Sequence, residues 1–205
     1  MSTISSQEAT KEVFKSGFVT LIGRPSAGKS SLLNALMGKK LAISSPTAQT
    51  TRHRFRAVHT TDSHQIIIVD TPGVHKPHDT LGEELNTTAL KSLEGIDVAA
   101  FVLDASAPFG TGDEWVISQL AQCSMPKLLV LSKIDLVTQE ELDLQRQRAL
   151  EAGQWDGVVA LSSVTGEQID TFIELVEQFL PAGPLWFPAD METDQPIEVI
   201  IAEFI

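Results

Sequence analysis

The stretch GRPSAGKS, residues 23–30, gives the strongest indication of the fold in this sequence. It matches the pattern G-x-x-x-x-G-K-[ST] of a phosphate-binding loop, in which backbone N–H groups and a helix N-terminus surround the phosphates of a nucleotide. The apolar run Phe18 to Ile22 precedes it, and apolar residues at helical spacing follow it from Ser30 to Met37. This order of strand, glycine-bearing loop and helix is the one that phosphate binding requires, so we predict a phosphate loop and disfavour a chance glycine turn.

The residue types within the loop suggest how it would hold a nucleotide with magnesium. Lys29 is expected to bridge the β- and γ-phosphates, where negative charge is concentrated. The hydroxyl of Ser30 is expected to bind Mg²⁺. The nucleotide contacts predicted from the whole loop come from Gly23, Ser26, Ala27, Gly28, Lys29, Ser30 and Ser31.

Strand and helix patterns alternate along the rest of the chain. Two β-rich runs joined by a short turn predict a hairpin, and each later apolar run is separated from the next by a helical stripe. This alternation predicts an α/β fold of three layers, with a mostly parallel six-stranded sheet and one antiparallel strand. The expected strands are 18–22, 55–61, 64–70, 98–104, 128–132 and 158–162, and the expected helices are 30–37, 81–93, 114–121, 138–152 and 167–179.

Polar motifs follow three of the predicted strands, where ligands of such sheets bind. Asp70 is expected to hold a magnesium-bound water, and the Gly73 N–H to sense the γ-phosphate, with Thr71 and Pro72 between them also in the nucleotide site. An ordinary turn is the alternative for this D-x-P-G sequence. The loop 44–53 is rich in Ser, Thr and Pro, and its candidate magnesium ligands are Thr47, Thr50 and Thr51.

The sequence SKID, residues 132–135, predicts the choice of base. The Asp135 carboxylate can accept hydrogen bonds from N1–H and N2–H of guanine, and adenine offers no such donor pair, so GTP is favoured over ATP. A helix-capping aspartate is the alternative. Ser132 and Lys133 are assigned to the same nucleotide site, and a backbone N–H of Ser162 or Ser163 is expected to meet guanine O6.

Charge and composition exclude several classes of protein. The chain of 205 residues has 27 acidic and 15 basic side chains, and its net charge of −12 opposes electrostatic binding to a phosphate backbone. No apolar run reaches the about 18 residues that a membrane-spanning helix needs. The only cysteine, Cys123, excludes an internal disulfide and is expected to pack as a small apolar residue. His75 and His78 share an H-x-x-H spacing, but a mobile loop is a better explanation than a zinc site.

The motifs GRPSAGKS, PTAQTTRHR, DTPGVHKP and SKID, in this order, resemble those of the Era family of bacterial GTPases over residues 16–205. This resemblance implies a P-loop GTPase fold, GTP and GDP as ligands, Mg²⁺ as cofactor, and GTP hydrolysis used as a molecular switch. It also implies that Thr51 is the switch threonine, so the expected magnesium ligands are Ser30, Thr51 and Asp70. The expected catalytic residues are Lys29, Thr51 and Gly73.

The resemblance also suggests how the chain is divided. We expect a flexible N-terminus over 1–16, an Era-type GTPase domain over 17–181, a proline-rich linker over 182–196, and the start of a truncated RNA-binding KH domain over 197–205. The implied partners are small-subunit ribosomal RNA and the 30S subunit, bound through the missing KH domain. The implied location is the cytoplasm, with peripheral contact at the inner membrane face. We expect no direct RNA binding by these 205 residues.

Three residues depart from common GTPase patterns. Ser132 and Ser26 stand where relatives usually carry Asn, so weaker nucleotide affinity, with specificity kept by Asp135, and an altered potassium response are expected. Val74 stands where Ras-like proteins place a water-orienting Gln, although Era-type proteins share this trait. Val74 therefore leaves open a second hypothesis, a nucleotide-binding module that recruits partners without useful hydrolysis. A third hypothesis, an ATPase, is disfavoured by Asp135.

Overall fold

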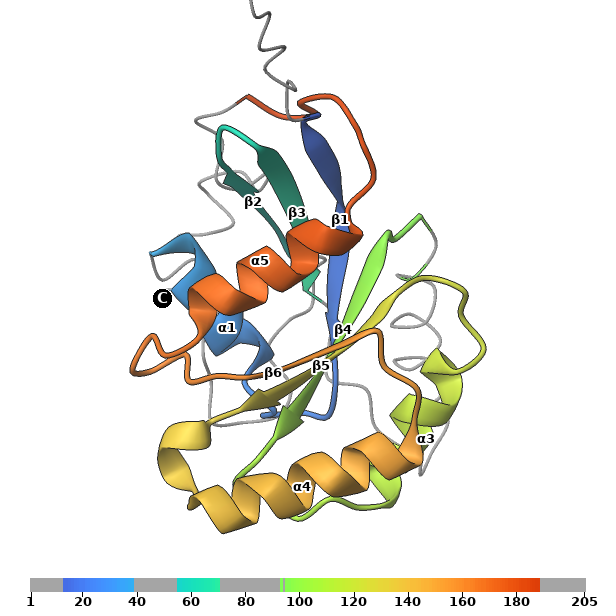
Figure 1. Ribbon diagram of the computed structural model, residues 1–205, viewed down its shortest axis with the longest axis vertical. Coiled ribbons are helices and arrows are strands. Elements are labelled where there is room, and N and C mark those ends of the chain that lie inside the picture. The colour runs from blue at the N-terminus through green and yellow to red at the C-terminus, as the bar shows by residue number, and fades with distance from the viewer. Residues whose placement is uncertain (1–12, 39–54, 71–92, 94, 189–205) are drawn as a thin grey trace, which may run out of the picture.

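The computed structural model describes residues 13–38, 55–70, 93 and 95–188, and within them one six-stranded sheet organises the chain (Figure 1). The strand order is β2-β3-β1-β4-β5-β6. Only β2 runs antiparallel to its neighbour, β3, and the other four pairings are parallel. The strands are β1 (Lys15–Ile22), β2 (Phe55–Thr60), β3 (His64–Asp70), β4 (Val98–Asp104), β5 (Lys127–Ser132) and β6 (Gly157–Ala160). The predicted six-stranded mixed sheet is confirmed.

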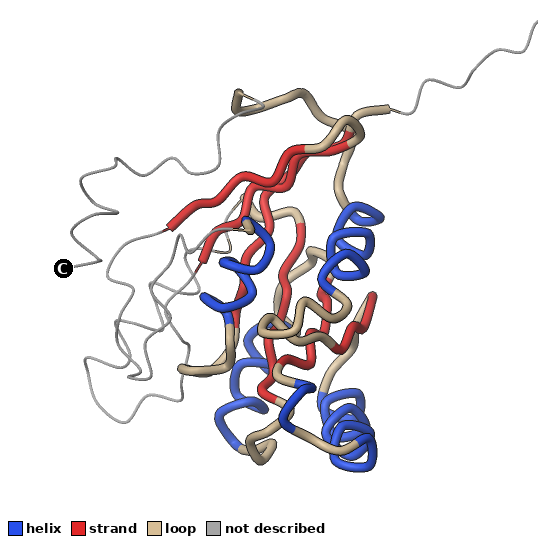
Figure 2. The backbone as a smooth tube through the Cα atoms, turned by 90° about the vertical axis from the view of Figure 1, so that its left-hand side faces the viewer, coloured by secondary structure: helices blue, strands red, loops and turns tan. Residues whose placement is uncertain are grey.

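Helices cover both faces of the sheet, which gives the three predicted layers (Figure 2). The helices α1 (Lys29–Met37) and α5 (Ile169–Phe179) pack on one face, and α3 (Thr111–Leu120) and α4 (Gln139–Ala152) pack on the other. Successive strand residues point to opposite faces, so β4 sends Ala100 and Val102 to the first core and Phe101 and Leu103 to the second.

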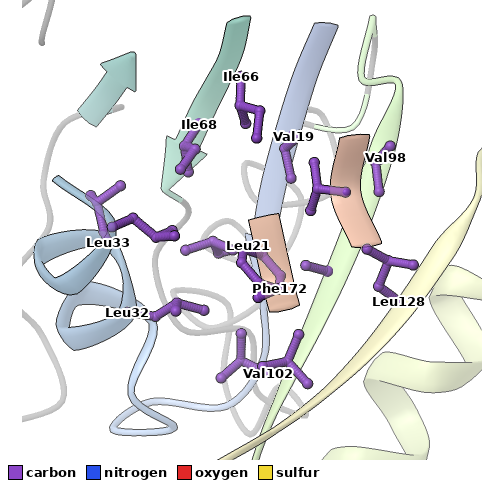
Figure 3. Close-up of a cluster of buried hydrophobic side chains, with 14 of the residues drawn as sticks. Val19, Leu21, Leu32, Leu33, Ile66, Ile68, Val98, Val102, Leu128 and Phe172 are labelled. Carbon is purple, nitrogen blue, oxygen red and sulfur yellow. The ribbon is translucent and has the colours of Figure 1, made fainter. Parts of the chain in front are cut away.

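The core under α1 and α5 supports the end of β1 from which the phosphate loop emerges. Figure 3 shows Leu32 and Leu33 of α1 and Phe172 of α5 directed toward Leu21 of β1. All four side chains are fully or almost fully buried. Cys123 is half-buried against the opposite core, as predicted for a packing residue. Of the predicted helix 81–93, only Leu93 is described, and it is buried in that same core.

Several element boundaries differ from the sequence predictions. The strand β1 begins at Lys15, before the predicted Phe18 and inside the predicted flexible N-terminus, because distant residues pair with it. The helix α3 begins at Thr111, three residues before the predicted Glu114, because Asp113 accepts a hydrogen bond from the Gly110 N–H at 3.0 Å and caps the helix. The strand β6 is shorter than predicted and ends at Ala160.

The segment 181–188 returns along the start of β1, and we call it the C-terminal strap. The Ser16 N–H donates to the Pro181 carbonyl at 3.1 Å, and the Gly183 N–H donates to the Phe14 carbonyl at 3.1 Å. The Ser16 hydroxyl donates to the Pro184 carbonyl at 2.7 Å. Gly183 and Pro184 of the predicted linker are therefore hydrogen-bonded to the segment that begins β1.

Candidate nucleotide-binding site

The predicted functional motifs that the structure describes gather at one edge of the sheet. Five parallel strands, β3, β1, β4, β5 and β6, have their carboxyl ends at this edge. The phosphate loop leaves from β1, which lies between β3 and β4 and is the point where the strand order reverses. Ligands of open α/β sheets bind at such a switch point.

Two glycines of the phosphate loop are required by its geometry. A Cβ atom at Gly23 would lie 2.3 Å from the Val102 carbonyl oxygen on β4, so no side chain fits there. Gly28 has φ 96°, in the left-handed region that favours glycine, and it caps the N-terminus of α1. Its carbonyl accepts the hydrogen bond from the Leu32 N–H at 2.8 Å, so the helix begins directly after it. The predicted strand, loop and helix are therefore all present.

Lys29 is held inside the phosphate loop. Its residue is only 7% exposed, and its Nζ donates to the carbonyl oxygens of Gly23 at 3.2 Å and Arg24 at 3.0 Å. The Arg24 carbonyl also accepts from the Ala27 N–H at 3.3 Å, which closes the turn. A cation fixed by the carbonyls of its own loop is suited to neutralising phosphate charge without a large rearrangement. Ser26, at φ 62°, is the exposed tip of the loop.

In spite of its short side chain, Ser132 connects the phosphate loop to residues 132–135, which we call the base loop. The hydroxyl is buried and lies 2.6 Å from the Ala27 carbonyl oxygen and 3.1 Å from that of Leu103. Because a hydroxyl has one proton, the two carbonyls share a single donor, and the nearer one is in the phosphate loop. The connection that an Asn supplies in relatives is therefore made here by a serine hydroxyl.

The Lys133 side chain joins the end of β5 to the end of β4. The residue has φ 60°, and its Nζ donates to Asp104 Oδ2 at 2.5 Å. The other carboxylate oxygen of Asp104 accepts from the Ser106 N–H at 2.9 Å and from the Ser106 hydroxyl at 2.6 Å. This pair fixes the aliphatic part of Lys133 beside the phosphate loop, where its Cε lies 3.9 Å from the position of a Cβ built on Gly28. No local sequence pattern marks Asp104 as part of the site.

Asp135 and Ser162, which come from different loops, meet at the ends of β5 and β6. The Ser162 hydroxyl donates to Asp135 Oδ1 at 2.5 Å and accepts from the backbone N–H groups of Val164 and Thr165, each at 3.2 Å. One oxygen of an exposed carboxylate is thereby held in place by a buried hydroxyl. This restricts the direction in which Asp135 can accept hydrogen bonds from a base.

Of the two backbone N–H groups predicted to donate to guanine O6, one already has a partner in the structure. The Ser162 N–H is already bonded to the Glu167 carbonyl at 3.1 Å. The N–H groups of Val164 and Thr165 are bonded to the Ser162 hydroxyl. Within the described part of the chain, no such bond uses the Ser163 N–H. Of the two serines in the prediction, Ser163 is therefore the one with a backbone donor to offer.

Several predicted site residues lie outside the described residues or are described only in part. Thr47, Thr50, Thr51, Thr71, Pro72, Gly73, Val74, His75 and His78 lie outside the described ranges. Asp70 is placed only by its backbone, which pairs with Phe55 on β2 and Leu21 on β1. Its position at the end of β3 brings it to the same edge as the phosphate loop.

Arg24 and Asp113 form a contact that sequence reasoning missed. The Arg24 side chain, in the phosphate loop, lies 2.9 Å from the carboxylate of Asp113 in α3. The two residues are 89 positions apart, and no local pattern in one sequence pairs them. In the part of the chain that the structure describes, no three His, Cys, Asp or Glu side chains gather as a metal site, and no helix is long and apolar enough to span a membrane.

A phosphate loop at a switch point, tied to an aspartate-bearing base loop, defines a nucleotide-binding domain of the P-loop class. The chain belongs to the family of 50S ribosome-binding GTPases, whose family model matches residues 18–133. The resemblance to Era-type GTPases is also confirmed by the comparisons with individual proteins.

Among curated relatives, GTPase Era of Alkaliphilus metalliredigens is 41% identical over 94% of this chain. Two solved structures are similar to the fold. One is Era in complex with MgGDPNP and nucleotides 1506–1542 of 16S ribosomal RNA, with TM-score 0.85 and 35% identity over 93% of this chain and 65% of that one. The other is a variant of Aquifex aeolicus Era bound to GDP and AlF4⁻, with TM-score 0.82 and 34% identity over the same shares. The chain also spans 65% of the Alkaliphilus relative's length.

Proposed function

We propose that this chain binds GTP with Mg²⁺ and hydrolyses it to GDP and phosphate as a molecular switch. The observation that carries the proposal is the connection of two recognition elements. The Ser132 hydroxyl joins the phosphate loop to the base loop, and the Ser162 hydroxyl fixes Asp135 in the same region. A site built from both elements suits a guanine nucleotide, whose phosphates and base must be held at once.

Each residue of the proposed site has a separate role. The phosphate loop, together with Ser31 directly after it, receives the phosphates, and Lys29 neutralises the charge that develops during transfer. Asp135 accepts from the guanine base, Ser163 N–H donates to O6, and Lys133 borders the phosphate loop. Thr51 and Gly73 are proposed to order around the γ-phosphate and to relax after hydrolysis, together with Thr71 and Pro72.

The proposed magnesium ligands are chemically suited to the ion. Mg²⁺ prefers oxygen ligands and keeps several waters, and the proposed set consists of the hydroxyls of Ser30 and Thr51 with the carboxylate of Asp70. The backbone of Asp70 pairs with that of Leu21 near the end of β1, the strand that leads into the phosphate loop, and this supports a magnesium site shared by Asp70 and Ser30. When bound, the ion supplies charge neutralisation at the phosphates.

The proposed cellular role follows from the relatives. One relative is solved with a 16S ribosomal RNA fragment, which supports small-subunit ribosomal RNA and the 30S subunit as partners of the longer protein in ribosome assembly. We assign that binding to a KH domain beginning near 197–205, after the GTPase domain (17–181) and the linker (182–196). The proposed location is the cytoplasm, with peripheral contact at the inner membrane face.

Single-turnover hydrolysis of GTP tests the proposal. The parent chain, in excess over GTP with Mg²⁺, should release phosphate slowly, and Lys29→Ala should lower that rate by about 100-fold or more. Lys127→Ala, which removes a lysine at the opposite edge of the sheet, is the matched control and should behave as the parent. Parent-like turnover by Lys29→Ala would show that the phosphate-loop assignment is wrong. Tight GTP binding without turnover by the parent would favour the recruitment module.

A further inference from the structure

The phosphate loop is fastened to helix α3 by a charge pair that the proposed function does not use. Arg24 Nη1 lies 2.9 Å from Asp113 Oδ2 and donates to the Pro108 carbonyl at 3.3 Å. The Asp113 side chain is 2% exposed, whereas that of Arg24 is 42% exposed. A buried carboxylate is costly unless it is paired and hydrogen-bonded, so Asp113 depends on Arg24 for its charge partner.

Asp113 is itself held rigidly by the helix that carries it. The same Oδ2 atom accepts a hydrogen bond from the Gly110 N–H at 3.0 Å, which caps the first turn of α3. The aliphatic part of Arg24 lies against Gly112, where a Cβ atom would come within 3.3 Å of Arg24 Cδ. The guanidinium and the stem of Arg24 are therefore both fitted to the start of α3.

The backbone of Arg24 joins this contact to Lys29. The Arg24 carbonyl accepts from Lys29 Nζ at 3.0 Å and from the Ala27 N–H at 3.3 Å. A rotation of the Arg24 peptide would move both of these groups, which are parts of the phosphate site. One residue thus connects the N-terminus of α3, through its side chain, to the lysine, through its carbonyl.

We infer that Arg24 and Asp113 are positioning residues for nucleotide binding, which set the shape of the phosphate loop from α3. This inference rests on the proposed function, since it concerns the same site. Neither side chain is assigned to the base, whose recognition is assigned to Asp135 and Ser163. Loss of the pair should therefore speed the release of GDP and GTP alike and leave the preference of GTP over ATP unchanged.

The test measures the release of a fluorescent GDP analogue in the presence of Mg²⁺, by displacement with excess GDP. Arg24→Gln and Asp113→Asn should each speed release by about fivefold, as expected for an ion pair with one partly exposed partner. The double variant should release the GDP analogue no faster than the faster single variant, because the two substitutions remove the same ion pair. Arg24→Lys keeps the charge and should restore part of the effect. Arg148→Gln, on an exposed position of α4, is the control and should match the parent.

Thermal unfolding of the same variants without nucleotide separates positioning from stability. A purely structural role would lower the unfolding temperature and leave release at 25 °C unchanged, and this would overturn the inference. Additive effects in the double variant would overturn it as well. Because Arg24 is partly exposed, its variants test the inference even if Asp113→Asn fails to fold. A parent that binds no GDP analogue would refute the proposed function together with this inference, whereas a binding parent with parent-like variants would refute the inference alone.

Discussion

Single hydroxyl groups organise the base-recognition region. Ser132 and Ser162 are both buried, come from the ends of adjacent strands, and each holds a partner from another loop. A buried hydroxyl fixes the groups to which it is hydrogen-bonded because any displacement leaves a polar group without a hydrogen bond. Ser132, which stands where relatives carry Asn, therefore still connects the base loop to the phosphate loop, and the connecting group is a hydroxyl.

We predict that Ser132→Ala weakens the binding of GDP by about fivefold to thirtyfold, corresponding to about 1–2 kcal/mol for a lost buried hydrogen bond. The substitution leaves the Ala27 carbonyl without its Ser132 donor and frees the base loop from the phosphate loop. Equilibrium titration with a fluorescent GDP analogue measures the change. Ser118→Ala is a matched control, because it removes an exposed hydroxyl that also donates to a main-chain carbonyl. An unchanged affinity in Ser132→Ala would show that the tie is unimportant for binding.

Among the helices and strands, the features that depend on residues close together in the chain were predicted correctly from the sequence. Thr138 and Glu141 predicted a capping box, and the structure has both of its bonds: Thr138 N–H to Glu141 Oε2 at 2.8 Å and Glu141 N–H to Thr138 Oγ1 at 3.3 Å. The hydrogen bonds from Thr138 hold the pKa of Glu141 below its usual value. The strap could not be predicted in this way, since its bonds to Gln65 join residues more than 100 positions apart.

Gln65 is the central anchor of the strap. Its buried amide donates from Nε2 to the Phe187 carbonyl and to Thr60 Oγ1, each at 2.9 Å. Its Oε1 accepts from the N–H groups of Trp186 at 2.9 Å and Phe187 at 3.0 Å. Proline and glycine residues in this segment predict an irregular backbone, but the attachment of its part at Trp186 and Phe187 depends on one buried side chain in β3.

We predict that Gln65→Leu lowers the free energy of unfolding by about 2–3 kcal/mol, because the strap backbone at Trp186 and Phe187 loses its hydrogen bonds to this buried side chain while the volume is roughly kept. Urea denaturation followed by tryptophan fluorescence measures the loss. Gln178→Ala, at an exposed position of α5, should change stability by about 0.5 kcal/mol or less. A parent-like midpoint for Gln65→Leu would mean that the strap contributes little to the stability of the domain.

Two histidines of the β2–β3 hairpin lie close together, and one of them contacts α5. His59 and His64 have ring centroids 5.8 Å apart, and His64 Nδ1 lies 3.2 Å from Glu177 Oε2. Burial and the neighbouring His64 lower the pKa of His59 below its usual 6.5, and Asp170 offsets part of this shift. The folded state therefore prefers a neutral His59.

This shift predicts a loss of stability on acidification. Because the pKa of His59 is lower in the folded than in the unfolded state, the unfolded chain takes up the proton first as the pH falls. His59 does not reduce stability above about pH 6.5, its usual pKa, and stability is lost as the pH falls below this value and through the lower pKa of the folded state. Thermal unfolding at about pH 7.5 and about pH 5.5 should show a smaller decrease for His59→Gln than for the parent. Equal decreases in the two proteins would exclude His59 as a source of the acid sensitivity.

At the scale of the whole molecule, the sequence was sufficient for the fold class and for the motifs of the site. The continuous apolar strands, the spacing of the helical stripes and the strand–loop–helix context of GRPSAGKS all gave local signals. The contacts that shape the site join distant segments. Arg24 with Asp113, Lys133 with Asp104, and Ser162 with Asp135 became visible only when the sheet brought the strand ends together.

The net charge of the molecule leads to a prediction about nucleic acid. With a net charge of −12, this chain should bind small-subunit ribosomal RNA weakly or not at all, because counterion release supplies most non-specific affinity. The short basic stretch 52–56 should add at most a shallow, salt-sensitive contact. Titration of the RNA 3′ end with the chain, a GTP analogue and Mg²⁺ at physiological salt measures this. Submicromolar, sequence-dependent binding would place an RNA site on the GTPase domain itself.

Competition between GTP and xanthosine triphosphate, in the parent and in Asp135→Asn, tests whether Asp135 recognises the guanine base of GTP. In the parent, the Asp135 carboxylate should accept from the guanine N2 amino group, and GTP should bind far more tightly. In the variant, an amide can donate to the C2 carbonyl of xanthine, so the preference should move toward xanthosine triphosphate. GTP affinity should fall by about tenfold to a hundredfold, as expected for the loss of a hydrogen bond to a charged group. Equal GTP affinity in the two proteins, with no gain for xanthosine triphosphate, would contradict the account.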